Sequence, residues 1–359
     1  MGTVTVALVF GGRSSEHSIS CATAAGILAA IDRDRYDVVP VGVTADGVFV
    51  LEQDDPEAFR MSAAGEPPRV TDNGSRVAWP TRAGERVLTV SRPDAPAARV
   101  AVDVVFPLLH GRWGEDGTIQ GMLDLVDMPY VGSGVLGSAL GMDKHFTKTV
   151  LRAAGIAVAP WSVVSRARWR AAPHEVHAEA LEWGLPAFVK PARGGSSVGV
   201  GRVAAADELD SALAAAFAED DRVLVERQVT GREIEVGVLG GRRGAPARTG
   251  APGEIVVEKG FYDFDAKYRD SGGVRLACPA DLEPAVARQA ADLAARAFDV
   301  LGLAGLARVD FFLTADGFVV NEVNTMPGFT PISMFPTSWR AVGLDYPSLI
   351  DELISLALE

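Results

Sequence analysis

The sequence predicts an α/β fold that begins with a parallel sheet. Apolar runs typical of strands alternate along the chain with stretches typical of helices, as in a parallel sheet covered by helices. The first such unit is complete, because an apolar run at 4–10 ends in the glycine pair Gly11-Gly12 and leads into a helical stretch at 19–31. The length of 359 residues allows two or three domains.

The rest of the first region contributes two more predicted strands and an insertion. Strands are expected at 36–43 and 102–107, because both are short apolar runs rich in valine. Between about 53 and 98 the chain is rich in Pro, Gly and charged residues, with short strand-like pieces at 77–79 and 87–90. We interpret this stretch as an insertion carried by the first region.

A second region begins near Gly132. Asp143 is a suitable N-cap for a helix that runs to about Ala154 and is ended by Gly155. A helix over about 282–301 has the clearest amphipathic pattern in the chain. The remaining predicted elements are strands at 187–190, 198–200, 222–226, 233–239, 254–258, 306–314 and 318–324, and a C-terminal helix at 346–358.

Composition excludes several classes of function. The 47 acidic and 34 basic residues give a formal net charge of −13, which disfavours a nucleic-acid partner because it repels phosphate backbones. An anionic ligand then needs a local cluster of basic groups. No apolar run suits an export signal or spans a bilayer, so no membrane partner is expected. Two cysteines, Cys21 and Cys278, are too few for a disulfide scaffold and suit a cytoplasmic protein.

The last two predicted strands form a hairpin whose register can be derived. A three-residue loop at 315–317, with glycine in its last position, pairs residues whose numbers sum to 632. Asp310 then lies opposite Glu322, Arg308 lies opposite Asn324, and all four side chains share one face. The other face carries the apolar residues expected in a core, namely Val309, Phe311, Leu313, Val319 and Val323.

The shared polar face of this hairpin is a candidate metal site. Two carboxylates and an amide oxygen are hard donors suited to Mg²⁺, and Arg308 beside them could hold a phosphate that the metal also touches. The alternative is a solvated sheet face with one Asp–Arg ion pair. A two-residue turn would shift the register and place the two carboxylates on opposite faces.

A second candidate site is the glycine- and serine-rich turn at 190–199. Its backbone N–H groups and hydroxyls suit phosphate oxygens, and Lys190 and Arg193 add positive charge. Lys144 is a further candidate cation. The turn is not a Walker A loop, because it lacks Gly-Lys-Ser/Thr and a strand follows it. The alternative is an ordinary flexible hairpin tip.

A third candidate is His110, which follows the predicted strand at 102–107. Ligands of α/β sheets bind at the carboxyl edge of the strands, where this histidine is expected. The alternative is a loop residue without a function. The Gly11-Gly12 turn after the first strand lacks the full Gly-x-Gly-x-x-Gly pattern, so a nicotinamide dehydrogenase is not supported.

Seven motifs occur in one order along the chain. They are Phe-Gly-Gly-Arg-Ser-Ser-Glu at 10–16, Leu-His-Gly through Gly at 109–117, Met-Asp-Lys at 142–144, Lys-Pro through Gly at 190–199, Phe-Tyr-Asp-Phe-Asp-Ala-Lys-Tyr at 261–268, Arg-Val-Asp at 308–310 and Asn-Glu-Val-Asn-Thr-Met-Pro-Gly at 321–328. Together they resemble the D-alanine–D-alanine ligases of the ATP-grasp superfamily over essentially the whole chain.

The resemblance implies three domains, of which the second and third clamp ATP. The N-terminal domain, 1–132, would be Rossmann-like and carry the 53–98 insertion. The central subdomain would span 133–229 and the C-terminal catalytic domain 230–359. The implied reaction joins two D-alanines through an acyl phosphate and releases ADP and phosphate, as peptidoglycan precursor synthesis requires. The resemblance also implies a homodimer.

The resemblance further implies roles for individual residues. For ATP these are Lys144, Lys190, Ser197, Glu226, Arg227, Val229, Glu233, Phe261 and Lys267. For two Mg²⁺ ions, which Mn²⁺ can replace, they are Asp310, Glu322 and Asn324. For substrate binding they are His110, Ser333 and Met334, and for catalysis Glu16, Ser196, Tyr268, Arg308 and the backbone N–H of Gly328.

The segment 261–268 resembles the lid loop that keeps water from the acyl phosphate. By the same resemblance, Ser196 and Tyr268 would link Glu16 to this lid, and Tyr268 favours D-alanine over D-lactate as the second substrate. Three alternatives stay open: D-alanine–D-lactate ligation, D-alanine–D-serine ligation, and a nucleotide sensor without catalysis. A sensor would be expected to lose Arg308 or a metal ligand, and this sequence retains them.

Overall fold

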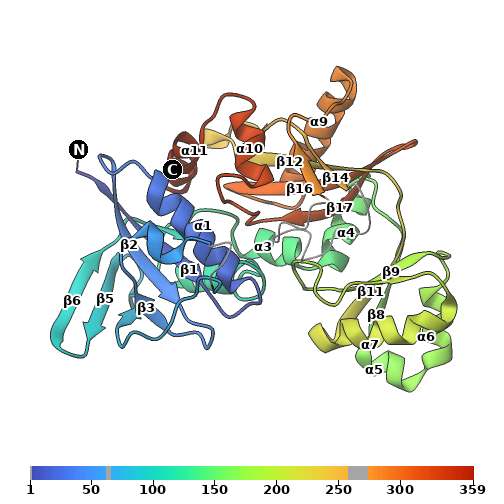
Figure 1. The fold of residues 1–359 in the computed structure, drawn as a ribbon, viewed down its shortest axis with the longest axis horizontal. Coiled ribbons are helices and arrows are strands. Elements are labelled where there is room, and N and C mark those ends of the chain that lie inside the picture. Colours follow the sequence, from blue (N-terminus) through green and yellow to red (C-terminus); the bar gives the residue numbers. More distant parts are fainter. Residues whose placement is uncertain (1, 62–65, 258–273) are drawn as a thin grey trace.

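The computed structural model describes residues 2–61, 66–257 and 274–359 and confirms an α/β fold with several sheets. The N-terminal region, blue in Figure 1, lies at one end of the molecule, and the yellow-green region around residues 160–230 lies at the other. The C-terminal sheet, orange to red, lies between them. None of the helices in the described part of the chain is long and apolar enough to cross a membrane.

The first sheet is parallel around its central strand, as predicted. Its strands are β1 (Val4–Gly11), β2 (Tyr36–Val43), β3 (Phe49–Leu51) and β7 (Val104–Pro107). Their order is β3-β2-β1-β7, and β1 pairs in parallel with both β2 and β7. The carboxyl ends of β1 and β7 therefore meet at one edge, the expected place for a ligand.

The turn after β1 is fixed by a glycine and by the following helix, α1 (His17–Ala30). Gly11 has a φ of +92°, and a Cβ there would lie 2.4 Å from the Val43 carbonyl oxygen, so a side chain does not fit. Ser20 of α1 accepts a hydrogen bond from the Gly11 N–H at 2.8 Å and donates one to the Leu108 carbonyl at 2.6 Å. These bonds tie the ends of β1 and β7 to the start of α1.

The insertion forms a small antiparallel sheet at the far edge of the N-terminal region (Figure 1). It consists of β4 (Arg76–Ala78), β5 (Val87–Arg92) and β6 (Ala95–Ala101), preceded by the short helix η1 (Pro56–Phe59). Strand β6 was not predicted from the sequence, because it is exposed along nearly its whole length and has no apolar alternation. The strand expected to begin at 102 begins at Val104 as β7.

The central sheet is antiparallel. It has the order β10-β9-β11-β8, with β8 (Trp161–Ser165), β9 (Ala187–Pro191), β10 (Gly201–Val203) and β11 (Arg222–Arg227). Its helices are α5 (Arg166–Ala171), α6 (Pro173–Ala180), the short η2 (Ala206–Glu208) and α7 (Leu209–Glu219). The strand predicted at 198–200 is wrong, because these residues belong to the turn, where Ser196, Ser197 and Gly199 all have positive φ.

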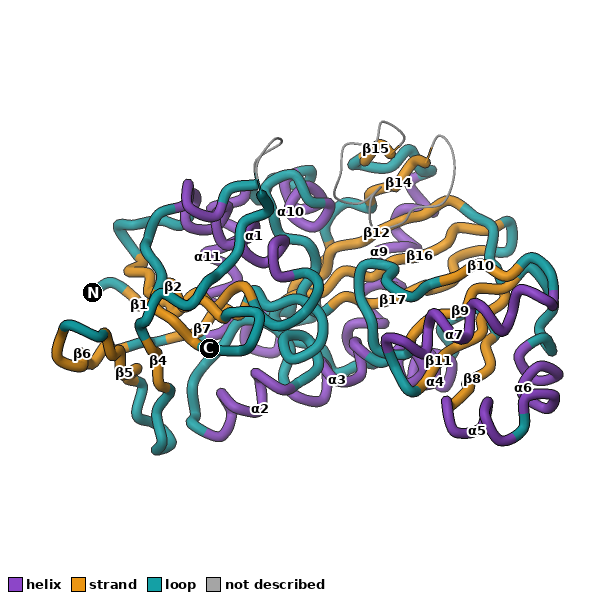
Figure 2. The backbone as a smooth tube through the Cα atoms, turned by 60° about the horizontal axis from the view of Figure 1, so that its bottom comes forward, coloured by secondary structure: helices purple, strands orange, loops and turns teal. Residues whose placement is uncertain are grey.

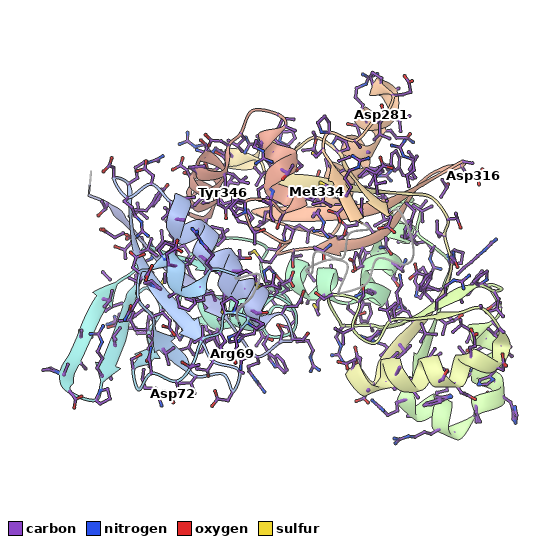
Figure 3. All side chains as sticks on the ribbon, in the orientation of Figure 1. Arg69, Asp72, Asp281, Asp316, Met334 and Tyr346 are labelled. Carbon is purple, nitrogen blue, oxygen red and sulfur yellow. The ribbon has the colours of Figure 1, made fainter. Side chains whose placement is uncertain are left out.

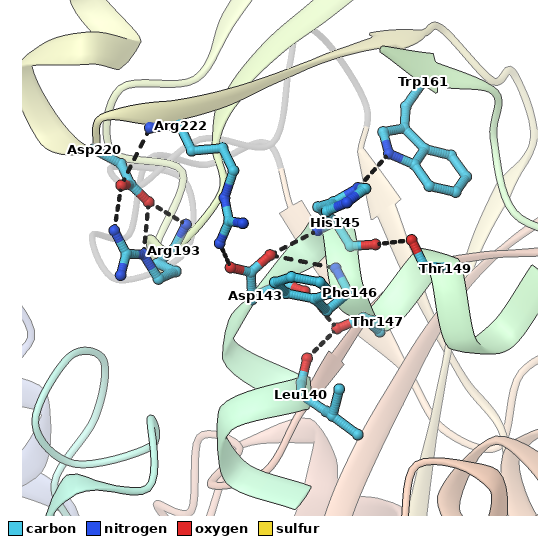
Figure 4. A network of polar contacts seen from close by, with 10 residues as sticks. All are labelled: Leu140, Asp143, His145, Phe146, Thr147, Thr149, Trp161, Arg193, Asp220 and Arg222. Atoms are coloured by element: carbon cyan, nitrogen blue, oxygen red, sulfur yellow. Dashed lines mark hydrogen bonds and ion pairs between the residues drawn. The ribbon is translucent and has the colours of Figure 1, made fainter. Parts of the chain in front are cut away.

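Three helices lead from the first region into the central sheet: α2 (Thr118–Leu125), α3 (Val135–Met142) and α4 (Lys144–Ala153). The predicted N-cap is confirmed, since the Asp143 carboxylate accepts hydrogen bonds from the His145 N–H at 3.1 Å and the Phe146 N–H at 3.3 Å (Figure 4). The same carboxylate pairs with Arg222 of β11. The start of α4 is therefore attached directly to the central sheet.

The C-terminal sheet has the order β15-β14-β12-β16-β17, and a short strand pairs with β12 beside this path. Its strands are β12 (Arg232–Leu239), β13 (Arg248–Thr249), β14 (Gly253–Val257), β15 (Val274–Ala277), β16 (Leu306–Thr314) and β17 (Gly317–Asn324). The accompanying helices are η3 (Arg242–Gly244), α9 (Pro284–Val300), α10 (Met334–Arg340) and α11 (Tyr346–Ala357). Figure 2 shows the strands of the C-terminal and central sheets in orange, and Lys190 of β9 contacts Asn321 of β17 at 3.3 Å.

The hairpin of β16 and β17 reaches the predicted pairing by a different route. The turn has two residues instead of three, because Thr314 pairs with Gly317. A bulge between Asp310 and Phe311 leaves Asn321 without a partner and restores the predicted register beyond it. Asp310 therefore lies opposite Glu322. Near the turn the register differs from the prediction, so Phe318 and Val320 are buried in place of Val319.

One hydrophobic core joins the two ends of the chain. Leu349 and Ile350 of α11 pack in the same core as Leu8 and Phe10 of β1. The Tyr36 hydroxyl of β2 also donates a hydrogen bond to Asp351 of α11. The predicted boundaries at 132/133 and 229/230 stay predictions, and α11, although last in the chain, packs against the first region.

Candidate active site

Two adjoining cavities lie where the N-terminal loops, the glycine-rich turn and the C-terminal hairpin meet. They share a wall formed by Lys144, Gly194, Gly195, Ser196, Glu235, Asn321 and Glu322. The first cavity is also lined by Glu16, His110, Arg308, Asn324, Gly328, Ser333 and Met334. The second is also lined by Lys190, Ser197, Glu226, Arg227, Val229, Glu233 and Asp310. Every predicted site residue within the described ranges therefore borders one of the two cavities.

Three predicted site residues cannot be placed in this way. Phe261, Lys267 and Tyr268 lie outside the described residues. Their assignments, including the lid and the Tyr268 link to Glu16, stay predictions.

Glu16 connects the N-terminal loop to the glycine-rich turn. Its side chain is buried, and it accepts a hydrogen bond from the Ser196 hydroxyl. A Cβ on Gly195 would lie 2.5 Å from Glu16 Oε2, so a side chain at this position would displace the carboxylate. The predicted Glu16–Ser196 link is therefore present, 180 residues apart in sequence.

His110 is buried in the first cavity with one nitrogen unused. Its Nδ1 donates a hydrogen bond to the Met326 carbonyl at 3.1 Å, whereas Nε2 has no partner among the described residues. Burial lowers the pKa of His110, although the nearby Glu16 carboxylate opposes this effect. A largely neutral imidazole with a free Nε2 suits contact with a bound substrate.

Glu115 is a cavity residue to which the sequence analysis gave no role. One carboxyl oxygen accepts a hydrogen bond from the Gly111 N–H at 2.6 Å and the other from the Met326 N–H at 3.0 Å. Burial, together with the charge of Glu16, raises the pKa of Glu115 to about 8. Glu115 lies in the motif at 109–117, but nothing in the sequence around it indicates its contact with Met326.

Ser333 and Met334 lie where α10 begins, against the loop after β17 (Figure 3 labels Met334). Ser333 Oγ accepts a hydrogen bond from the Thr330 N–H at 3.2 Å and lies 2.7 Å from the Thr330 hydroxyl. A Cβ on Gly328 would lie 3.3 Å from the same Ser333 oxygen. The Gly328 backbone and the Ser333 hydroxyl are thus neighbours on one wall of the first cavity.

The second cavity has a cationic wall. Lys144 Nζ donates to the Gly194 carbonyl at 2.6 Å, which holds the lysine against the glycine-rich turn. Lys190 Nζ reaches Asn321 Oδ1 at 3.3 Å and lies 3.4 Å from Glu226 Oε2. Both predicted phosphate-binding lysines therefore border the cavity that the turn covers.

Behind this wall lies a buried lysine that the sequence analysis missed. Lys148 of α4 donates to Glu226 Oε1 at 3.1 Å, and both side chains are almost fully buried. Burial lowers the pKa of Lys148, while Lys148 and Lys190 outweigh the burial of Glu226 and lower the pKa of that carboxyl. The positive charge of Lys148 therefore stabilises the Glu226 carboxylate in its buried position.

The C-terminal hairpin carries the opposite charge. Arg308 forms two hydrogen bonds with the Asp310 carboxylate, both at 2.7 Å, and its Nε lies 3.2 Å from Glu235 Oε2. Burial opposes its charge, but the carboxylates of Asp310 and Glu235 raise the pKa of Arg308 well above its usual range. Asn324 Nδ2 donates to Asp310 Oδ2 at 2.9 Å. Glu235, which the sequence analysis did not single out, belongs to this cluster.

The predicted metal ligands meet as a set of hard oxygen donors. Asp310 and Glu322 pair across the two strands, and Asn324 contacts Asp310. The described residues contain no group of three or more His, Cys, Asp or Glu arranged to hold a metal. The donor set is therefore two carboxylates and one amide oxygen, chemistry that fits Mg²⁺ when ligand oxygens complete the coordination.

Sequence comparison with known proteins shows which family the chain belongs to. The family model for the D-ala D-ala ligase N-terminus matches residues 5–133, and the one for the D-ala D-ala ligase C-terminus matches residues 150–355. The chain belongs to the D-alanine–D-alanine ligase family. The D-alanine–D-alanine ligase of Arthrobacter sp. (strain FB24) is 51% identical, over 98% of this chain and 94% of that relative. The ligase of Kineococcus radiotolerans is also 51% identical, over 98% and 96%.

Solved ligase structures are similar to this chain in fold over nearly its whole length. The D-alanine–D-alanine ligase from Coxiella burnetii is 35% identical with a TM-score of 0.84, covering 100% of this chain and 94% of that one. The VanG D-Ala:D-Ser ligase from Enterococcus faecalis is 31% identical with a TM-score of 0.84, covering 99% and 100%. These ligases share the ATP-grasp fold that the resemblance implied.

Proposed function

We propose that this chain is an ADP-forming ligase that joins two D-alanines for peptidoglycan precursor synthesis. The observation that carries the proposal is that all described residues of the predicted site border two adjoining cavities, one with lysines along one wall and the other bounded by Glu16 and His110. Relatives about 50% identical over nearly the whole chain carry the D-alanine–D-alanine ligase name. The second cavity would hold ATP and the first the two amino acids.

In the first step, a D-alanine carboxylate attacks the γ-phosphorus of ATP and gives an acyl phosphate and ADP. Catalysis of such a transfer is mostly positioning and charge neutralisation. Lys144 and Lys190 would hold phosphate oxygens under the glycine-rich turn, and Glu226 and Glu233 would hold the adenosine. Glu16 would pair with the ammonium of the first D-alanine, and its bond to Ser196 supports that placement.

Mg²⁺ belongs to the proposal as an expected partner of ATP. Asp310, Glu322 and Asn324 would hold it, and when bound it would neutralise charge on the phosphates. The support is the set of oxygen donors on one face of the hairpin. The bulge at Asn321 sets the register that pairs Asp310 with Glu322.

In the second step, the amine of another D-alanine attacks the acyl carbonyl and phosphate leaves. The oxyanion that forms needs preorganised donors. Arg308 and the Gly328 N–H would supply them, since both border the first cavity. Ser333 would hold the carboxylate of the second D-alanine, and Met334 would pack beside it.

The test of the proposed function is ADP release with D-alanine as the amino acid substrate, followed by D-serine and D-lactate. We expect release with D-alanine alone, and slower formation of mixed products when D-serine or D-lactate competes. The 31% identity to a D-Ala:D-Ser ligase makes D-serine the necessary comparison. Faster ADP release with D-serine or D-lactate than with D-alanine as the second substrate would contradict the proposal.

We also propose that the ligase works as a homodimer in the cytoplasm. Both described cysteines are free thiols, which is compatible with a reducing compartment. Size-exclusion chromatography with light scattering gives the mass in solution. A mass of 37.8 kDa, that of a single chain, would contradict the dimer.

A further inference from the structure

The loop that joins β17 to α10 is held at a peptide just before Gly328. The Met326 N–H donates to Glu115 Oε1 at 3.0 Å, and the Met326 carbonyl accepts from His110 Nδ1 at 3.1 Å. Both polar groups of one residue are thus bound by side chains of the N-terminal 110–115 loop. The contacts join positions more than 200 residues apart.

The same loop is held again just after Gly328. The Tyr346 hydroxyl of α11 donates to the Phe329 carbonyl at 2.7 Å (Figure 3 labels Tyr346). The Phe329 ring is fully buried and packs against Phe106 and Phe335. Gly328 therefore lies between two anchored residues, and none of the hydrogen bonds within the described ranges uses its N–H.

Glu115 is the part of these anchors that connects two loops. Its second carboxyl oxygen accepts the Gly111 N–H at 2.6 Å, so the side chain bridges the 110–115 loop and the loop after β17. In either protonation state each carboxyl oxygen keeps a lone pair that can accept an N–H, whereas an amide of the same shape sets an NH2 donor against one of the two N–H groups. The site therefore distinguishes Glu from Gln by hydrogen bonding alone.

We propose that Glu115 is a positioning residue for the amide-forming step, because by holding the Met326 N–H it fixes where the Gly328 N–H points. The inference rests on the proposed role of Gly328 as an oxyanion donor. Such donors act only when aligned, and a misplacement of about 1 Å costs on the order of a hundredfold in rate. Phosphoryl transfer does not use the Gly328 N–H, so the two steps should respond differently to Glu115.

The test is Glu115→Gln, with both steps measured in the same protein. Dipeptide formation follows the second step, and exchange of ¹⁸O between the bridging and non-bridging β–γ positions of ATP in the presence of D-alanine follows reversible acyl phosphate formation. We expect dipeptide formation to fall about 30- to 100-fold, up to the cost of a misplaced donor and below that of a lost one. Isotope exchange should stay within threefold, so the ratio of exchange to product rises at least tenfold. An equal fall in both steps, or no fall in either, overturns the proposal.

A second variant covers the case in which Glu115→Gln does not fold. Tyr346→Phe removes the Phe329 anchor without touching either cavity, and we expect a smaller fall in dipeptide formation, about 3- to 10-fold, with exchange again retained. Unchanged dipeptide formation in Tyr346→Phe would count against a positioned Gly328. Glu182→Gln, at an exposed position, is the matched control and should leave both steps unchanged. Absence of D-alanine-dependent ADP release in the unmodified protein would instead refute the proposed function.

Discussion

Two buried charge clusters border the second cavity, and they have opposite compositions. On the central side, Lys148 and Lys190 contact the carboxylate of Glu226, and Lys144 adds a third positive charge near Lys148. On the C-terminal side, the carboxylates Glu235, Asp310 and Glu322 surround the single guanidinium of Arg308. One wall thus has an excess of cations and the other an excess of anions. The difference indicates that a polyphosphate is bound from one side and a cation from the other.

The walls also differ in how their charges are kept in place. Lys148 and Glu226 are almost fully buried, so their charges are stabilised by each other and hardly by water. Arg308 and Asp310 are slightly more exposed, at 14% and 11% of their side chains, and border the cavities directly. We therefore expect changes in the anionic cluster to affect chemistry, and changes in the cationic cluster to affect nucleotide binding.

The largest expected effect comes from Arg308→Ala. It removes a proposed oxyanion donor, and we expect kcat for ADP release to fall by about a thousandfold. It also leaves Asp310 and Glu235 buried without their cation, a change that costs about 3–5 kcal/mol when a buried pair is broken. Arg308→Lys, which keeps the charge and loses the two-pronged bond to Asp310, is the matched control and should fall less. Activity of Arg308→Ala within threefold of the unmodified protein would remove Arg308 from the mechanism.

A smaller effect is expected from Glu322→Gln, which weakens the anionic wall without removing Arg308. We expect the Mg²⁺ concentration for half-maximal ADP release to rise at least 10-fold, since even indirect metal contacts are worth 10- to 100-fold. The measurement is a Mg²⁺ titration at saturating ATP. Glu254→Gln on the same sheet, where Glu254 pairs with the exposed Arg232, should leave the titration unchanged. An identical Mg²⁺ dependence for Glu322→Gln would contradict the metal assignment.

The two walls also show what sequence reasoning could reach. The hairpin part of the anionic wall was predictable because strand alternation brings Asp310, Glu322 and Asn324 to one face over short distances, whereas Glu235 on β12 was not singled out. Even so, the assumed three-residue turn was wrong, and the bulge at Asn321 compensated for it. A bulge depends on packing over the whole sheet, which local sequence does not specify.

The buried half of the cationic wall was not predictable in this way. Lys148 is an unremarkable helix position until α4 packs against β11, 78 residues further along the chain. Glu115 depends in the same way on a contact 211 residues away. Motif order identified the family, whereas residues that act through long-range contacts required the structure.

A third effect tests whether the buried lysine serves the nucleotide. Lys148→Met leaves Glu226 buried with Lys190 at 3.4 Å, so the pKa of Glu226 should rise. Lys148→Met also removes the hydrogen bond that holds Glu226 Oε1 in place, so we expect KM for ATP to rise about tenfold, equivalent to about 1.4 kcal/mol, with kcat within threefold. Lys148→Arg keeps the charge and should have a smaller effect. A fall in kcat without a change in KM would contradict a role in nucleotide binding.

The smallest effect concerns the helix that carries both Lys144 and Lys148. Asp143 caps α4 and pairs with Arg222 (Figure 4). Asp143→Ala removes the cap, which costs about 1 kcal/mol, and should lower Tm by about 2–4 °C. Asp143→Asn keeps an oxygen for the cap and loses the charge, so its Tm should lie between the two. Because Lys144 and Lys148 both lie on this helix, KM for ATP should rise modestly in Asp143→Ala. The Mg²⁺ titration should be unchanged. A shifted Mg²⁺ dependence would mean that the two walls are not independent.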